Sequence, residues 1–533
     1  MSKLFANTGI LVLSILKRDR FRIIVWIISL TLLTVLIGGM LPDLYPTGVE
    51  RQIMAETMKN PAIIVMLGPG YGLDNYTDGA MMAHFMLAFT ALSVGIMGIL
   101  LTVRHTREDE EEGSIEMIRS LPIGSLATLT ATFLVLALTN VILSLAVGLG
   151  LYSLGIDSMD LGGSLLYGAS LGAIGLFFTA LTGLFAQLTS NPRSTTGYSF
   201  SLLIIFYILR GMGDVSNELL SLISPLGLIL RTEVYVSNYW WPVLLTLVIS
   251  IIVFVGALYL NSIRDLGAGF IPTKPGNSRA SRLLSSPLGL ALRLQRTAII
   301  AWIIGMFLLG VSYGSVLGDL EGFLTSTSML QQMIPTAEGL SLTERFITML
   351  MTVVSIIGTV PVLMFVLKLW GEEKKNRTEQ LYARAVSRNM LIGSYTLIAA
   401  IVAPVIQLVS ILGLWSAGIF GMEEPISFIT FFKAGFAHLP AIWIMIGLAV
   451  LLIGFIPRLT GLSWAYLGYS FFVVYLGGML QLPEWMAKLS PFGHIPQIPI
   501  EEINWGIILV LIFIAIALVV AGFWAYNRRD IEG

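Results

Sequence analysis

The sequence contains no cysteine, and charged residues are scarce: only 12% of its 533 residues are Asp, Glu, Lys or Arg. The lack of cysteine excludes a disulfide framework and a thiolate metal site. Soluble domains carry about a quarter charged residues. A chain with so little charge and 56% apolar residues is therefore predicted to be an integral membrane protein. The net charge of −1 adds little, because membrane proteins sort their charge by side of the membrane.

Motifs for nucleotide and metal chemistry are also missing from the sequence. It has no Gly-x-x-x-x-Gly-Lys-Ser/Thr loop, in which glycines admit the phosphates and the lysine binds them. Any ATP would therefore be hydrolysed by another chain. The four histidines do not show metal-ligand spacing. We expect no catalytic residue, metal or cofactor in this chain, and no nucleic-acid partner.

Twelve apolar stretches approach or exceed the roughly 20 residues that cross a bilayer. In the first half they lie at about 23–40, 81–103, 126–152, 161–188, 198–212 and 241–260. In the second half they lie at about 298–317, 346–370, 390–418, 431–455, 463–479 and 504–526. A Ser-Pro-x-Gly segment follows the short fifth span and the short eleventh span, at Ser224–Gly227 and Ser490–Gly493. We expect both segments to re-enter the outer leaflet or to lie in the interface.

The two sets of six spans read as parallel copies of one unit. Trp26 matches Trp302 in the first span of each set, and Pro192 matches Pro457 before the fifth. We therefore predict an all-α membrane fold with two six-span repeats, at 1–265 and 281–533, joined by a cytoplasmic linker at 266–280. Apolar stretches before each first span, at 10–16 and 283–294, predict amphipathic helices on the membrane surface.

Positive charge predicts the orientation of the spans. If the N-terminus is cytoplasmic, most of the 31 Lys and Arg residues fall in the inner segments. We therefore expect a multi-pass protein of the cell membrane with both termini in the cytoplasm.

A charged segment after the second span, here called the elbow, occurs once in each half, at 111–125 and 374–388. Glu116 and Glu379 align between the two copies. In the first copy Ile115, Ile118 and Leu121 fall three apart, which predicts one apolar helical face. Gly113 and its counterpart Asn376 both tolerate a left-handed backbone, and Pro122 disfavours continuing the helix. A solvated loop is the alternative interpretation, but it does not explain why the pattern recurs.

Six spans per half, a preceding surface helix and these elbows resemble ABC transporter permeases of the second type. The duplicated form resembles bacterial exporters of polyketide antibiotics and multidrug exporters, over nearly the whole chain. The resemblance implies a permease subunit, not itself an enzyme, that moves hydrophobic or amphipathic small molecules outward. It also implies two ATPase subunits, identical or different, which would hold ATP and Mg.

In this resemblance each elbow is a coupling helix seated in an ATPase subunit. The acidic run Glu108–Glu112 in the first copy and the Lys374-Lys375 pair in the second depart from the usual pattern, which puts identical docking of the two elbows in doubt. The residues expected to couple are Glu111, Glu112, Gly113, Glu116, Arg119, Pro122, Glu372, Glu373, Asn376, Glu379 and Arg384.

The resemblance places the substrate pathway between the halves, along the second, fifth, eighth and eleventh spans. Aromatic and methionine side chains there would give an adaptable apolar wall, although ordinary helix packing or lipid contact is the alternative for each. The stripe Tyr466, Tyr469 and Phe472 is the strongest candidate, because hydroxyls facing lipid would be poorly satisfied. Arg210 either lines an outer gate or extends to the headgroups. The candidate residues are Phe85, Met86, Phe89, Phe206, Tyr207, Arg210, Met349, Tyr466, Tyr469, Phe472 and Tyr475.

Two other functions remain open at this point. An ion-coupled carrier of the major facilitator type also has six plus six spans, but its second-to-third loop would carry Gly-x-x-x-Asp-Arg-x-Gly-Arg, where this chain reads Arg104-His105-Thr106-Arg107-Glu108. A membrane-embedded transferase would need clustered Asp, His or Arg in an outer loop. Dependence on ATP would separate the first alternative, and a chemical product the second.

Overall fold

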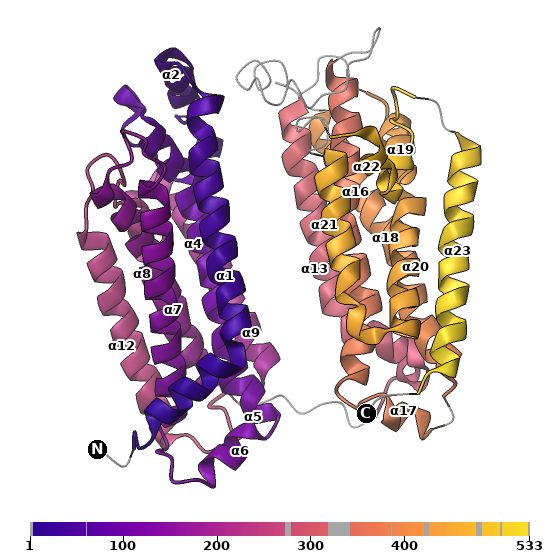
Figure 1. Ribbon diagram of the computed structural model, residues 1–533, viewed down its shortest axis with the longest axis horizontal. Coiled ribbons are helices and arrows are strands. Elements are labelled where there is room, and N and C mark those ends of the chain that lie inside the picture. Colours follow the sequence, from indigo (N-terminus) through magenta and orange to yellow (C-terminus); the bar gives the residue numbers. More distant parts are fainter. Residues whose placement is uncertain are drawn as a thin grey trace. The chain divides into compact units, whose positions relative to one another are not determined.

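The computed structural model describes residues 4–59, 61–271, 279–317, 342–384, 386–419, 426–475, 482–501 and 504–530. The chain forms two compact units, Met1–Gly276 and Asn277–Gly533. Every regular element in the described residues is helical (Figure 1). The predicted linker at 266–280 lies partly outside the described residues.

The first unit contains six long helices and several short ones. The long helices are α1 (Thr8–Leu44), α4 (Asp78–Val103), α7 (Ala127–Tyr152), α8 (Leu161–Leu188), α9 (Pro192–Ser216) and α12 (Trp241–Ile263). The short ones are α2 (Gly48–Thr57), α3 (Pro61–Leu67), η1 (Leu73–Asn75), η2 (Arg104–Glu108), α5 (Asp109–Glu111), α6 (Ser114–Arg119), α10 (Glu218–Ile223) and α11 (Pro225–Leu230).

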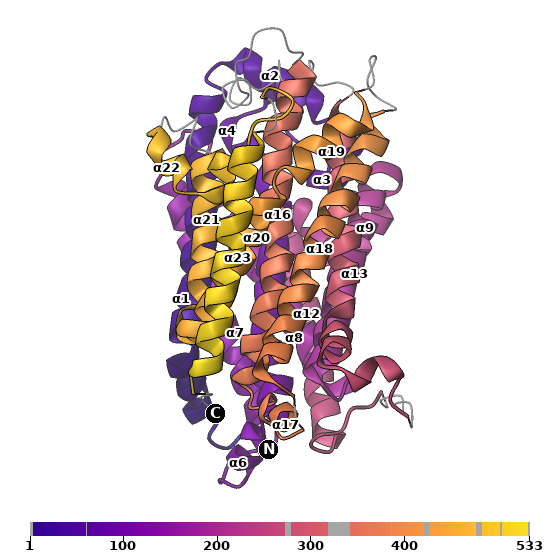
Figure 2. The ribbon, with the colours of Figure 1, turned by 90° about the vertical axis from the view of Figure 1, so that its right-hand side faces the viewer.

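The second unit has a similar succession of helices. The long ones are α13 (Pro287–Val316), α16 (Leu342–Glu373), α18 (Arg388–Gly418), α20 (Leu439–Phe455), α21 (Gly461–Tyr475) and α23 (Trp505–Arg528). The short ones are η3 (Arg282–Ser285), α17 (Glu379–Tyr382), α19 (Phe428–Phe436), η5 (Pro457–Leu459), α22 (Glu484–Lys488) and η6 (Pro491–His494). The short helix α17 lies at the same end of its unit as the last residues of α23 (Figure 2).

Eleven helices in the described part of the chain are long and apolar enough to cross a membrane. They coincide with the predicted spans, except that the predicted eleventh span corresponds to the shorter α21, and residues 476–481 lie outside the described part. The prediction of an all-α, multi-pass membrane protein is confirmed.

The segments predicted as surface helices before each half are helical. Residues 10–16 belong to α1, which continues without a break from Thr8 to Leu44, whereas η3 and the first turns of α13 cover most of 283–294. Their place on the membrane surface stays a prediction. The charged residues after Leu16 are good helix formers, and Arg22 pairs with Asp19 one turn earlier at 2.8 Å. The charge that suggested a boundary therefore continues the helix.

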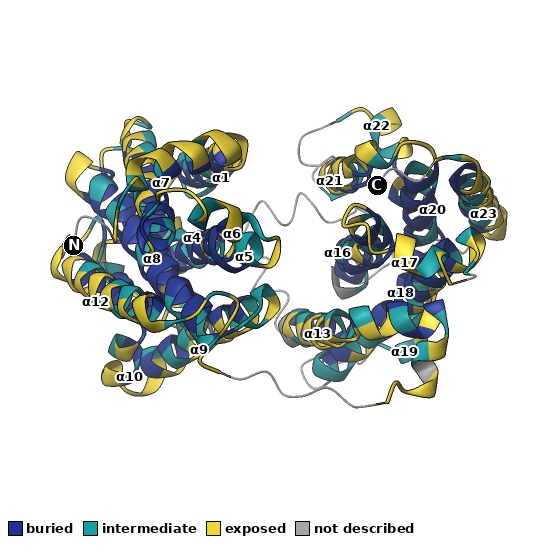
Figure 3. Cartoon of the chain, turned by 90° about the horizontal axis from the view of Figure 1, so that it is seen from below, coloured by how far each residue is buried: buried dark blue, intermediate teal, exposed yellow. Residues whose placement is uncertain are grey.

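Each unit buries two of its helices more deeply than the rest. In the first unit these are α4 and α8, while α1 and α12 expose most of their length. Figure 3 shows the same contrast in colour, with dark α8 inside and the yellow face of α12 outside. In the second unit α16 and α20 take the enclosed positions. Small residues permit the close approach of helices without a hydrophobic driving force; a Cβ on Gly168 of α8 would meet the Ser144 carbonyl oxygen of α7 at 2.1 Å.

The two Ser-Pro-x-Gly segments adopt matching local structures. Each starts a short helix after a buried serine, Ser224 or Ser490. A Cβ on Gly227 would lie 2.1 Å from the Ser221 carbonyl oxygen, and a Cβ on Gly493 the same distance from that of Ala487. The glycine thus allows the chain to fold back on the preceding helix in both units. Their depth in the membrane stays a prediction.

Candidate functional site

The elbow of the first unit follows directly from the second span. Helix α4 passes into a π-helical turn at Arg104–Glu108, then into α5, and the chain reverses at Gly113 with φ of 76°. Asn376 has φ of 56° at the equivalent point of the second unit. The predicted left-handed backbone is therefore present at both positions, where glycine or asparagine avoids the steric cost of most side chains.

Only part of the predicted apolar face of the first elbow turns inward. Ile115 is buried and Ile118 packs against the start of α1, but Leu121 is 57% exposed. Met117 is 70% exposed, and Glu116 is exposed beside it. The expectation for Leu121 is therefore wrong, and the outward face of this elbow combines a carboxylate with two large apolar side chains.

Hydrogen bonds join the exit of this elbow to the start of the chain. The Asn7 amide donates to the Pro122 carbonyl at 2.7 Å. The backbone N–H of Gly124 donates to Ala6, and that of Leu126 donates to Leu4, both at 3.0 Å. The segment before α1 is thereby fixed to the elbow.

A buried charge cluster joins α1 to the root of the same elbow. The Asp19 side chain is 2% exposed and lies 2.9 Å from His105 Nε2 and 3.2 Å from Arg104 Nε. Arg18 from α1 forms two hydrogen bonds with Asp109, at 3.1 and 2.6 Å. The Asp19 contacts join α1 to the π-helical turn, and the Arg18 contacts join it to α5. A displacement of the elbow root is therefore resisted by α1, and the reverse.

The second elbow presents a similar exposed carboxylate with different neighbours. Glu379 and Arg384 are exposed, whereas Thr378 is buried. Arg377 pairs with Glu372 at 3.3 Å, so the elbow is held to the end of α16. Among the described residues, neither Glu116 nor Glu379 forms an ion pair through its side chain. An anchoring role within the chain therefore has no support, and both carboxylates are available to a partner.

Each elbow root is clamped to the residue that follows the last span of its unit, a pair called here the latch. In the first unit, Arg264 after α12 binds Glu110 through two hydrogen bonds of 3.0 and 3.1 Å. Glu110 also accepts the Gly267 N–H at 2.6 Å and pairs with Arg107 at 3.1 Å. In the second unit, Arg529 after α23 binds both oxygens of Glu373, at 2.6 and 2.5 Å.

Sequence reasoning found only one acid of the two latches. Glu373 is among the predicted coupling residues, but its counterpart Glu110 is not, and the predicted Glu111 and Glu112 are exposed. A signal was present in the sequence: the last span ends with Arg264-Asp265-Leu266 in one half and Arg529-Asp530-Ile531 in the other. This repeated tripeptide, read together with the repeated elbow, would have indicated that both arginines serve the same purpose.

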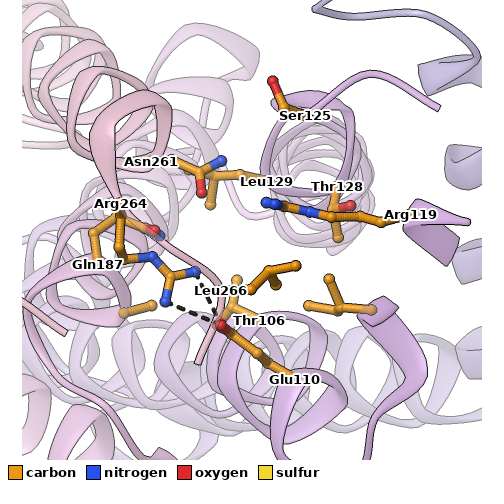
Figure 4. Close-up of a pocket in the computed structure, with 12 residues that line it drawn as sticks. Thr106, Glu110, Arg119, Ser125, Thr128, Leu129, Gln187, Asn261, Arg264 and Leu266 are labelled. Carbon is orange, nitrogen blue, oxygen red and sulfur yellow. Dashed lines mark hydrogen bonds and ion pairs between the residues drawn. The ribbon is translucent and has the colours of Figure 1, made fainter. Parts of the chain in front are cut away.

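A small cavity of about 30 Å³ lies beside the first latch (Figure 4). Arg119 reaches into it from α6, while Asn261 and Arg264 approach from the end of α12. Burial, together with the Arg264 guanidinium, lowers the pKa of Arg119. This predicted coupling residue therefore points into the unit instead of toward a partner.

Arg210 does not extend toward the headgroups. Its side chain is 0% exposed and pairs with the equally buried Asp214 at 3.3 Å. Its Nη2 donates to the carbonyls of Val65 and Met66, at 2.9 and 3.1 Å. The guanidinium thus satisfies the C-terminal carbonyls of α3 and has its own charge balanced, as a buried ion needs.

The tyrosines of α21 form hydrogen bonds within their own unit. Tyr466 donates to the Leu489 carbonyl at 2.7 Å, and Tyr469 donates to that of Met486 at 2.9 Å. Their hydroxyls are therefore satisfied without a polar cavity. The preference for this stripe, which assumed that its hydroxyls would be poorly satisfied against lipid, does not hold. Phe472 remains exposed. The role of the stripe in transport stays a prediction.

The remaining pathway candidates lie on the predicted spans with mixed exposure. Phe89 is 38% exposed, whereas Phe85 and Met86 of α4 are half-buried. Tyr207 donates its hydroxyl to Met66 at 2.9 Å. Half-buried side chains also include Phe206, Met349 and Tyr475. None of these residues lines the cavities beside Arg119, Asp78 or Asn504 in the described part of the chain.

Comparison with known proteins gives two agreeing results. A family model described as "Multidrug efflux system permease Rv1217c, C-terminal domain" matches residues 14–260 and 284–527. The chain is also 32% identical, over 527 residues, to the multidrug efflux system permease protein Rv1217c of Mycobacterium tuberculosis. That alignment covers 97% of this chain and 94% of the relative.

Proposed function

The chain belongs to the family of the multidrug efflux system permease Rv1217c, and from this premise we propose that it is the permease subunit of an ATP-driven multidrug exporter. Two ATPase subunits, identical or different, bind and hydrolyse the ATP, with its Mg, because this chain has no motif to bind them. The observation that carries the proposal is the similarity to a multidrug efflux permease over 97% of the chain. The family model, which matches residues 14–260 and 284–527, covers both elbows and all predicted spans.

The exposed face of each elbow supports contact with a soluble partner. Glu116, Met117 and Leu121 project from the first elbow. Glu379 and Arg384 project from the second. Clustered exposed apolar side chains with charges beside them mark protein interaction sites. Because the chain has two such elbows, we expect two ATPase subunits, each with a binding site for one elbow.

The latches give the elbows a route to the membrane helices. When ATP closes the ATPase pair, each elbow is displaced, and the latch carries the displacement to the end of α12 or α23. Export then follows as a shift of population between inward-facing and outward-facing states, driven by the different affinity of those states for ATP. The cargo is a hydrophobic or amphipathic small molecule, in keeping with the apolar and aromatic side chains on the spans.

Transport into inverted membrane vesicles tests the proposal. Vesicles that contain this chain and its ATPase should accumulate a fluorescent amphipathic drug when ATP and Mg are added. An uncoupler that abolishes the proton gradient should leave accumulation intact. Uptake that follows the gradient and ignores ATP would instead establish the ion-coupled carrier. Co-purification of a Walker-motif ATPase with the full chain is the complementary test.

The proposed orientation puts both termini and both elbows in the cytoplasm of a cell-membrane protein. The absence of cysteine makes single-cysteine labelling direct. Met117→Cys and Gln380→Cys should resist an impermeant thiol reagent added to intact cells, whereas Asp157→Cys and Glu484→Cys should react. All four positions are exposed, so a lack of labelling reports the side of the membrane and not burial. Labelling of position 117 from outside would contradict the orientation.

A further inference from the structure

The cavity beside the first latch contains more positive charge than negative. Two guanidinium groups, from Arg119 and Arg264, line it together with the single carboxylate of Glu110. Glu110 pairs with Arg107 and Arg264. Arg119 forms no ion pair or hydrogen bond through its side chain with the residues that the structure describes. One cation that points into a partly enclosed space is therefore left without an anion.

Several other groups on the cavity wall can donate hydrogen bonds to an anion, while the Oε1 of Gln187, unpaired within the described part of the chain, is an acceptor. The Arg264 side chain is 7% exposed, and its Nε–H has no hydrogen-bond partner among the described residues. Ser125 and Thr128 place hydroxyls at the start of α7, and Asn261 adds an amide. Buried donors without acceptors cost free energy, so an occupant with acceptor oxygens would relieve that cost.

The second unit has no such arrangement at the equivalent positions. Counting from Glu116 and Glu379, Arg119 corresponds to Tyr382; counting from Arg264 and Arg529, Asn261 corresponds to Tyr526. The two tyrosine hydroxyls hydrogen-bond to each other at 2.7 Å, and Tyr526 is buried. Large neutral side chains therefore occupy the place where the first unit has a cation and an open space.

Ser125 also has a larger counterpart, Arg388, whose guanidinium binds within the second unit. Its Nη1 donates to the carbonyls of Tyr526, Asn527 and Arg529. The latch itself is the same in both units, so the latch does not require the cavity. The open, cationic version is a separate feature of the first unit.

We propose that this cavity binds a phosphate group of an anionic phospholipid headgroup, held by Arg119 and by the free Nε–H of Arg264. The cavity lies at the ends of α7, α8 and α12, where apolar helix gives way to charged elbow, which is the depth of lipid phosphates. Basic pockets between membrane helices on the cytoplasmic side are suited to such headgroups. A free phosphate ion presents the same oxygen acceptors to these arginines, and the experiment below distinguishes the two sources.

The dimensions suit part of a phosphate and not a whole lipid. A volume of about 30 Å³ admits about two water-sized occupants at roughly 10–15 Å³ each. The two non-bridging oxygens of a phosphodiester fill two such places, and the ester groups remain at the mouth. Arginine binds such oxygen pairs through parallel N–H···O hydrogen bonds.

The test uses the purified full-length chain in vesicles without ATPase or drug, so it stands apart from the proposed export function. Thermal unfolding is followed in phosphatidylcholine vesicles as phosphatidylglycerol is added. We expect the unfolding temperature to rise to a plateau. Arg119→Gln should raise the half-saturating phosphatidylglycerol content by about tenfold or more, the effect of losing one strong charged contact. The double variant Arg119→Tyr, Asn261→Tyr copies the second unit and should lose the response.

Arg193→Gln is the matched control, because Arg193 is an exposed arginine at the same end of the same unit. It should respond as the parent chain does. Equal losses in Arg119→Gln and Arg193→Gln would reduce the effect to general surface charge and overturn the proposal, as would a parent chain with no response. A full response to inorganic phosphate in pure phosphatidylcholine vesicles, abolished by Arg119→Gln, would support the site and identify free phosphate as its source.

Discussion

Both units join the elbow root to the end of the last span by a Glu–Arg ion pair, but the residues around this pair differ between them. In the second unit the latch acid Glu373 has only Arg529 as its ion-pair partner among the described residues. In the first unit Glu110 is shared by Arg264, Arg107 and the Gly267 N–H. The recurrence of the pair indicates that tying the elbow root to the last span is a requirement of each half. The different surroundings indicate which parts of each elbow are free to diverge.

The largest effect is expected when the less protected latch is broken. Arg529→Ala leaves the buried Glu373 carboxylate unpaired, which should cost about 3–5 kcal/mol in the free energy of unfolding. Arg264→Ala leaves Glu110 its other two partners and should cost about 1–2 kcal/mol. Thermal unfolding of the purified chain measures both. The neighbouring Arg528→Ala, which removes only an exposed contact with Trp524, serves as the control.

A loss for Arg264→Ala as large as that for Arg529→Ala would contradict this reading of the latches, because the extra partners of Glu110 would then be without effect.

The next effect concerns the C-terminal end of α9, where the residues of the two units differ. Arg210 corresponds to Tyr475 when the repeats are aligned at Pro192 and Pro457. Arg210→Met leaves the buried Asp214 with the Ser221 hydroxyl at 2.6 Å and the more distant Arg231 at 3.7 Å. It removes the nearer ion pair and the donors to the α3 carbonyls, and should cost about 2–3 kcal/mol, whereas Tyr475→Phe should cost less than about 1 kcal/mol. Thermal unfolding again provides the measurement. Adding Asp214→Leu to Arg210→Met should cost less than the sum of the single changes, since the two residues are in contact.

Additive losses in that double variant would show that Arg210 acts through the α3 carbonyls alone.

Charge reversal at the elbow glutamates should impair coupling without destabilising the chain. Glu116 and Glu379 are exposed, so Glu116→Lys and Glu379→Lys should change the free energy of unfolding by no more than about 0.5 kcal/mol. Each should weaken ATPase binding, about tenfold if one strong charged contact is lost, and should reduce drug export. The neighbours Glu111 and Glu112 in one elbow and Lys374 in the other predict unequal losses.

Glu218→Lys and Glu484→Lys reverse exposed charges away from the elbows and should leave ATPase binding unchanged. A chain carrying both elbow reversals that still exported at the parent rate would refute the coupling role.

The smallest effect is expected at the aromatic residues of the fifth and eleventh spans. Phe472 and Tyr207 occupy equivalent positions, but only Tyr207 forms a hydrogen bond, to Met66. Phe472→Ala should alter the range of exported compounds while expression stays normal. Tyr207→Ala should, in addition, lower stability by about 1 kcal/mol. Drug-resistance profiles and thermal unfolding measure the two effects, and unchanged profiles in both variants would place the pathway elsewhere.

Most of the fold could be predicted because each span is a long apolar run, which hydropathy detects without any tertiary information. The left-handed turns at Gly113 and Asn376 could also be predicted from residue type alone. Glu110 could not, because it stands in a run of acids and the π-helical turn at Arg104–Glu108 shifts the register of the side chains that follow. A helical wheel drawn from α4 therefore points the wrong acid inward.

Arg210 shows a second limit of sequence reasoning. Its partner Asp214 lies one turn away and was visible in the sequence, but the carbonyls of α3 that complete its environment are about 145 residues distant. The hydropathy pattern shows only that Arg210 is a charged residue near the end of a span. Tertiary contacts of this kind decide whether such a charge reaches water or is buried, and no local pattern contains them.

The unbroken course of α1 connects the elbow with the far end of its unit. Its 37 residues follow a path of roughly 55 Å at 1.5 Å per residue, well beyond the hydrocarbon core of about 30 Å. Its first third is fixed to the elbow through Asn7, Asp19 and Arg18. Its far end packs closely on the unit, since Leu41 is buried and a Cβ on Gly38 would lie 3.1 Å from Leu151. A push at the elbow is therefore carried along α1 to the opposite end of α7. Lys17→Pro would interrupt this connection near the elbow, separating ATPase binding, which should persist, from drug export, which should fail.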